Sequence, residues 1–107
     1  MDGNSEQLIT ELREGREKAF TQVFRMYYGP LLNYAGRILK DVELANDVVQ
    51  ECFCRLYERR KEIKRGFQVR PYLHRSVYNS CMDAIKHQKV ESNYINQELL
   101  DFYFSKV

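Results

Sequence analysis

The chain has 107 residues, which is enough for one compact domain and too short for two. Its three cysteines are odd in number and irregularly spaced, which excludes a disulfide framework and favours a reducing cytosol. Charged residues make up 30% of the sequence against five glycines and two prolines, which favours helices over a turn-rich sheet. No basic-then-apolar leader or long apolar run is present, so we expect a cytoplasmic protein without membrane insertion.

The net charge of +2 hides an uneven distribution. Residues 1–54 carry six Lys/Arg and nine Asp/Glu, whereas residues 55–89 carry ten Lys/Arg and three Asp/Glu. Residues 90–107 are again slightly acidic, with one Lys/Arg and three Asp/Glu. A basic block between acidic flanks predicts an anionic partner at one site.

The apolar spacing of the first forty residues predicts two helices. The first spans about residues 5–14, with Asn4 as N-cap and Gln7 at the capping-box position. The second begins near Arg16 or Glu17 and keeps apolar steps of three and four to Leu39. This continuity across Gly29-Pro30 favours a kinked helix, with a break at the proline as the alternative.

Two further helices are predicted after residue 40. Asp41 is a suitable N-cap for a third helix that runs to about Arg60. The periodicity is then lost over residues 61–70, which we predict to be a basic loop. Pro71 fits the first turn of a fourth helix that ends near Lys89.

The predicted fold class is therefore all-α, a compact bundle of about four helices. The final segment, residues 91–107, contains enough apolar side chains for a short docked C-terminal helix, although its composition is closer to that of a linker. No internal repeat or low-complexity tract is present.

The sequence offers no constellation typical of an enzyme. His74 and His87 are thirteen residues apart on one predicted helix, and no glycine-rich phosphate loop exists. Cys52 and Cys54 point to nearly opposite sides of a helix, so they cannot both bind one zinc ion unless the helix unwinds. We therefore predict no enzymatic activity, no cofactor and no metal, and a metalloenzyme is only a remote third hypothesis.

The predicted third helix carries a polar, mostly acidic strip opposite its apolar face. The strip alone is more often a solvated surface than a binding site, because most amphipathic helices have one. Its members are Glu43, Asp47, Gln50, Glu51 and Glu58.

The loop and the fourth helix combine basic residues with aromatic rings. Each residue taken alone could be a solvated charge or a half-buried ring. Together they suit single-stranded nucleic acid, because cations follow the phosphates while rings stack on bases. The set comprises Arg59, Arg60, Lys61, Lys64, Arg65, Arg70, Tyr72, Arg75, Tyr78, Asn79, Met82 or Asp83, and Lys86.

Two segments at similar separation resemble region two of bacterial extracytoplasmic-function (ECF) sigma factors. They are residues 41–57, DVELANDVVQECFCRLY, and residues 71–85, PYLHRSVYNSCMDAI. The stretches at 17–20 and 28–30 also fit, so the resemblance covers about residues 5–90. It implies a sigma factor domain that binds core RNA polymerase and recognises and melts the promoter −10 element.

The resemblance also implies two sets of site residues. Polymerase binding, to the clamp helices of the largest subunit, falls on Asp47, Gln50 and Glu51. Contacts with promoter DNA, chiefly its single-stranded nontemplate strand, fall on Ile63, Lys64, Arg65, Phe67, Arg70, Tyr72, Arg75, Asn79 and Lys86. Tyr72 stands where family members often have tryptophan.

One departure from the family is large. ECF sigma factors carry a second helical domain for the −35 element, and this sequence lacks it. We therefore expect residues 1–90 to be the region two domain and residues 91–107 the start of the interdomain linker of a longer protein. An anti-sigma factor is a further partner that the resemblance allows. The competing hypothesis is a helical protein-interaction adaptor without DNA-binding function, which would not need the basic and aromatic face.

Overall fold

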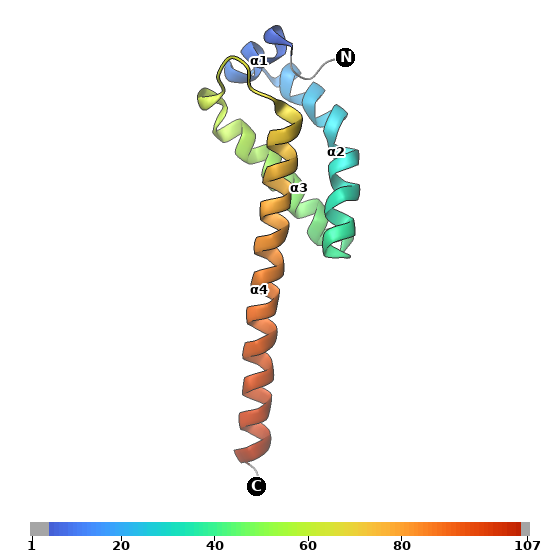
Figure 1. Ribbon diagram of the computed structural model, residues 1–107, viewed down its shortest axis with the longest axis vertical. Helices are drawn as coiled ribbons and strands as arrows, with labels where there is room; N and C mark the ends of the chain where they lie inside the picture. Colours follow the sequence, from blue (N-terminus) through green and yellow to red (C-terminus); the bar gives the residue numbers. More distant parts are fainter. Residues whose placement is uncertain (1–4, 106–107) are drawn as a thin grey trace.

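The computed structural model describes residues 5–105, with the side chains of 5–88, 98–99, 101–102 and 105. These described residues fold into four α-helices and one short 3₁₀ helix (Figure 1). No strand occurs in the described part, so the all-α prediction is confirmed. The elements are α1 (Glu6–Arg13), α2 (Glu17–Leu39), α3 (Val42–Glu58), η1 (Arg60–Glu62) and α4 (Val69–Ser105).

The first helix begins one residue later than its predicted cap implies. Ser5 is the N-cap, and its hydroxyl oxygen accepts from the backbone N–H of Leu8 at 3.2 Å. The capping box predicted with Gln7 is therefore wrong, because this side chain donates to Glu11 instead. The predicted cap, Asn4, lies outside the described residues. Ser and Asn are both good caps, so local sequence alone does not choose between them.

The second helix runs unbroken through Pro30, so the predicted continuity is confirmed and the alternative break is wrong. Pro30 is exposed, and solvent can hydrate the carbonyl that the proline ring leaves without a partner. The next apolar positions, Leu31 and Ala35, are fully buried against the neighbouring helices. Their burial favours continuing the helix beyond the proline.

The third helix begins as predicted. The carboxylate of Asp41 accepts from the backbone N–H of Leu44 at 3.0 Å, which satisfies one of the free amides of the first turn. Lys40, with φ of +54°, makes the sharp reversal from α2 to α3.

The fourth helix is much longer than predicted. It continues 37 residues from Val69 to Ser105, so the predicted end near Lys89 and the separate short C-terminal helix are wrong. The sequence beyond residue 89 has no glycine or proline to stop it. Figure 1 shows the orange and red part of α4 projecting past the other helices, and the molecule is 69 Å long but only 24 Å and 20 Å across.

The core lies where α2, α3 and the first half of α4 pack together, with α1 covering one end beside α2 and η1 (Figure 1). Its fully buried side chains are all apolar or thiol, and no charged or polar residue of the described part is buried. Among the largest are Leu12, Leu31, Leu56 and Leu73, one from each of the four helices. In residues 5–105, no helix has an apolar stretch suited to crossing a bilayer.

The three thiols differ in environment. Cys52 and Cys81 are fully buried, whereas Cys54 is exposed on the other side of α3. Burial raises the pKa of the Cys81 thiol, and the neighbouring Cys52 raises it further. A buried thiol is inert because reagents in solvent do not reach it. Cys54 is therefore the thiol that is available for reaction.

Replacing Asp41 with alanine should lower the free energy of unfolding by about 1 kcal/mol, because the Leu44 amide loses its acceptor. Asp41→Asn keeps a capping oxygen and should cost much less. Urea unfolding followed by circular dichroism measures both, with the exposed Asp83→Ala as a control in mid-helix. Equal losses for Asp41→Ala and Asp41→Asn would contradict the capping role.

Titration with an aromatic disulfide reagent should modify one thiol rapidly and two slowly. We expect Cys54→Ser to abolish the fast phase, while Cys52 and Cys81 react only when the fold opens. Addition of denaturant should merge the phases. A fast phase that survives Cys54→Ser would show that the core is accessible.

Candidate functional site

The basic loop between η1 and α4 is anchored by apolar residues at both ends. Ile63 is 4% exposed and Val69 is fully buried, so residues 64–68 form a short surface arch between two fixed points. A turn closed by the Phe67 N–H donating to the Lys64 carbonyl at 3.0 Å shapes the arch. Gly66, with φ of +85°, adopts a backbone conformation that other residues rarely take.

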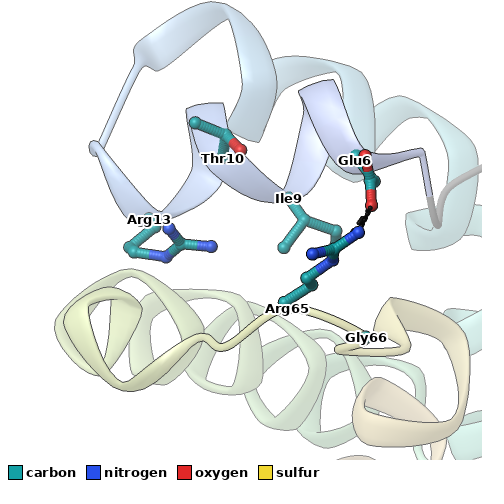
Figure 2. Close-up of a pocket in the computed structure, with 6 residues that line it drawn as sticks. All are labelled: Glu6, Ile9, Thr10, Arg13, Arg65 and Gly66. Atoms are coloured by element: carbon teal, nitrogen blue, oxygen red, sulfur yellow. Dashed lines mark hydrogen bonds and ion pairs between the residues drawn. The ribbon is translucent and has the colours of Figure 1, made fainter.

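Helix α1 lies against this loop (Figure 2). The Arg13 Nε–H donates to the Ile63 carbonyl at 2.8 Å, across fifty residues of sequence. Arg65 forms an ion pair with Glu6 at 3.0 Å, which Figure 2 shows at the other end of α1. Both side chains of the ion pair are largely exposed, so it contributes little stability. An open hollow of about 600 Å³ lies between α1 and the loop and is lined by Glu6, Ile9, Thr10, Arg13, Arg65 and Gly66.

A second, smaller cavity of about 190 Å³ lies beneath the loop on the side of α4. The rings of Phe67 and Tyr72 stand beside one another in its wall, with centroids 5.2 Å apart. Its lining consists of Leu56, Arg59, Glu62, Ile63, Phe67 and Tyr72. The structure therefore brings three of the residues predicted to bind DNA to one cavity.

The other residues predicted to bind DNA are exposed on the loop and on α4, and none is buried. They are Lys64, Arg65, Arg70, Arg75, Asn79 and Lys86. Ile63 differs from them because its side chain is buried in the core and is in reach of DNA only at the wall of the small cavity. Glu62 lines the cavity but was absent from the predicted set, since a lone acidic residue in a basic loop carries no signal in the sequence.

The three residues predicted to bind polymerase are exposed on α3. Asp47 makes no hydrogen bond or ion pair within the described residues. Glu51 pairs with Arg55 at 3.2 Å, and the Arg55 guanidinium also lies 3.5 Å from the hydroxyls of Ser76 and Ser80 on α4. Arg55 thus connects the acidic strip of α3 to the helix that carries Arg75 and Asn79.

An open, mainly apolar groove of about 580 Å³ borders the acidic strip. It lies between α2 and α3 and is floored by rings, with the centroids of Phe24 and Phe53 5.1 Å apart. Phe24 and Tyr57 are 40% and 46% exposed, which is unusual for large rings beside a well-formed core. The remaining lining is Phe20, Gln50, Cys54 and Glu58, so one residue of the predicted polymerase set belongs to the groove.

Residues with metal-binding chemistry are dispersed. The His74 ring packs against Tyr34 with centroids 5.2 Å apart, so it belongs to the interface between α4 and α2. In the part of the chain that the structure describes, no three His, Cys, Asp or Glu side chains gather as metal ligands would.

Comparison with known proteins connects these surfaces to a family. No solved structure matches the chain. The RNA polymerase sigma factor CarQ of Myxococcus xanthus is 26% identical over 90 residues, which are 84% of this chain and 52% of that protein. The chain thus spans about half the length of this curated relative. Residues 23–90 match Sigma-70 region 2, and the chain therefore belongs to the Sigma-70 region 2 family.

Proposed function

We propose that this chain is the part of a sigma factor that docks on core RNA polymerase through α3 and captures unpaired bases of the promoter −10 element. The capture surface consists of the loop at residues 63–70 and the first half of α4. The observation that carries the proposal is the small cavity walled by Phe67 and Tyr72 within a strongly basic segment. Six of the twelve residues from 59 to 70 are Lys or Arg.

The cavity suits a single planar group. At about 190 Å³ it is smaller than the roughly 300–1,000 Å³ of ordinary small-molecule sites. Two neighbouring rings offer faces for stacking, which contributes about 1–3 kcal/mol per base in single-strand binding proteins. Arg59 supplies donors and Glu62 supplies acceptors, and both are suited to hydrogen bonding with the edge of a base.

Capture of this kind melts DNA without any bond chemistry. A base inside a duplex cannot enter the cavity, so the protein binds the open state better than the closed one. Unpairing costs a few kcal/mol per base, and binding of the extruded base offsets this cost. The equilibrium therefore shifts toward the open promoter by the difference in affinity.

The exposed face of α4 would hold the strand on either side of the captured base. Arg75 and Lys86 are exposed cations on a helix whose opposite side, at Leu73 and Val77, is fully buried. A backbone fixed in this way places the charges before DNA arrives, which lowers the ordering cost of binding. Asn79 is exposed between them and can both donate to and accept from a base.

Docking on polymerase would use α3 and the adjoining groove. The carboxylates of Asp47 and Glu51 face solvent, while Gln50 joins the strip to an apolar groove that bears exposed rings. An apolar centre beside a charged rim is the usual anatomy of a protein interface. The acidic rim complements a basic coiled coil and contributes orientation and association rate more than affinity.

The adaptor hypothesis accounts for the apolar groove, which by itself indicates only a protein partner. It gives no reason for a ring-walled cavity beside a segment in which six of twelve residues are Lys or Arg. The two hypotheses therefore differ in one measurable property: a sigma factor domain binds DNA, and an adaptor does not.

Tyr72→Ala should weaken binding of the 107-residue chain to single-stranded DNA by about tenfold, because one stacking face of the cavity is lost. The probe is a fluorescein-labelled oligonucleotide selected by this chain from a random single-stranded pool, and anisotropy gives the affinity. Tyr72→Phe keeps the ring and should bind like the wild type. Equal affinities of all three proteins would refute the cavity as the base site.

Asp47→Ala should weaken co-precipitation with bacterial core RNA polymerase and leave the affinity for the oligonucleotide unchanged, because the carboxylate lies on α3. Asn79→Ala should weaken binding of the oligonucleotide and leave co-precipitation with core RNA polymerase unchanged. Asp83→Ala removes an exposed carboxylate from α4 instead of α3, and it is the charge-matched control for the loss of polymerase binding in Asp47→Ala. A variant that impairs both activities while remaining folded would contradict the assignment of the two activities to separate helices.

Lys64→Ala should reduce the salt dependence of oligonucleotide binding. Each phosphate neutralised by a cation contributes a slope of about −0.7 in log affinity against log salt for single strands. The exposed Lys18 on α2 lies outside the proposed surface, so Lys18→Ala should leave the slope unchanged. Indistinguishable slopes for the wild type and Lys64→Ala would remove Lys64 from the phosphate contacts.

A further inference from the structure

Helix α1 holds the loop that the proposed function assigns to base capture, although it contributes no residue to the small cavity. Figure 2 shows the loop passing alongside α1, with Glu6 and Arg13 at the two ends of the helix. The apolar side of α1 is fixed by Ile9 and Leu12, which are 3% and 0% exposed. This burial holds α1 in place, so a side chain of α1 can restrain the loop.

The restraint acts on the backbone of a single residue, Ile63. The Ile63 N–H donates to the Arg60 carbonyl at 3.1 Å, and the Ile63 carbonyl accepts from Arg13 at 2.8 Å. The second bond is half-buried and has a charged donor, which makes it stronger than a neutral hydrogen bond at the surface. Ile63 is therefore held at its side chain, its N–H and its carbonyl.

Ile63 is also part of the wall of the small cavity, together with Phe67 and Tyr72. Any rotation about the backbone of Ile63 would change where the arch leaves η1 and hence where the Phe67 ring stands. The exposed pair of Glu6 and Arg65 is too solvated to supply this restraint. The bond from Arg13 is thus the contact between α1 and the loop that is suited to fixing the cavity.

We propose that Arg13 is a positioning residue for base capture: its Nε–H holds the Ile63 carbonyl so that the cavity is formed before DNA binds. The inference rests on the proposed function of the loop. A preformed cavity binds more tightly because only the competent fraction of molecules takes up a base. Arg13 itself contacts neither the base nor the phosphate.

The test compares two neutral replacements of nearly equal length. In Arg13→Gln the side-chain nitrogen is as many bonds from the Cα as the Arg13 Nε, so a donor remains at the same place. Arg13→Met keeps the length but has no donor. Arg16→Met removes a charge from an exposed arginine near the end of α1 and controls for electrostatics. Each protein is titrated against the fluorescein-labelled single-stranded oligonucleotide selected with the wild type.

We expect Arg13→Met to bind about tenfold more weakly, while Arg13→Gln and Arg16→Met stay within about twofold of the wild type. The salt slope should not change in any variant, because no phosphate contact is removed. Core polymerase co-precipitation should also remain unchanged. Amides of residues 64–68 should exchange hydrogen faster in Arg13→Met than in Arg13→Gln.

Three results would overturn the proposal. Equal affinity of a folded Arg13→Met and the wild type would show that the bond is dispensable. An equal loss for Arg13→Gln and Arg13→Met, with a reduced salt slope, would make Arg13 a phosphate contact. If Arg13→Met proved unfolded by circular dichroism, Arg13→Gln decides, since a folded Gln variant with a tenfold loss contradicts the role of the donor. A wild-type chain that did not bind single-stranded DNA at all would refute the proposed function instead.

Discussion

The structure depends on how a segment dense in positive charge is held against the bundle. Residues 59–70 contain six Lys or Arg, and their mutual repulsion favours an extended, mobile chain. Burial of Ile63 and Val69, which flank the arch at residues 64–68, opposes this tendency. Each side chain contributes about 1.5–3 kcal/mol of stabilisation on leaving water. The charges can then stay exposed while the backbone between them is short and fixed. Binding of a polyanion would relieve the remaining repulsion, so the same arrangement that strains the free protein favours the proposed complex.

The packing of α3 on α4 constrains the two proposed interfaces in a similar way. Both helices contribute fully buried residues to one core, including Cys52 from α3 and Cys81 from α4. Arg55 adds polar contacts from the strip on α3 to Ser76 and Ser80. Because the helices form one packed unit, docking through α3 would also orient the face of α4. A rigid connection of this kind aligns a capture surface with DNA at no further ordering cost.

Much of this architecture follows from local patterns in the sequence. Apolar periodicity predicted the first three helices closely, and the cap at Asp41 and the stop at Gly15 follow from side-chain and backbone chemistry. Two errors concern helix ends. The cap of α1 was placed at Asn4 instead of Ser5, because the two residues differ little in capping energy. The end of α4 was placed near Lys89 although no stop signal follows that residue. The bond from Arg13 was not predictable, because it joins residues fifty apart and leaves no trace in either local pattern.

The ring pair also clarifies a feature that the sequence left open. The resemblance to ECF sigma factors places Tyr72 where tryptophan is common, and the smaller ring left its stacking role open. In the structure the Phe67 ring lies beside Tyr72, with centroids 5.2 Å apart, and both rings line the same cavity. The position of Phe67 depends on the turn at Gly66 and on the anchoring of Ile63 as well as on its contact with Tyr72. The proposed stacking wall is therefore shared between a helix and a loop, which makes the geometry of the loop as important as the identity of the residue on α4.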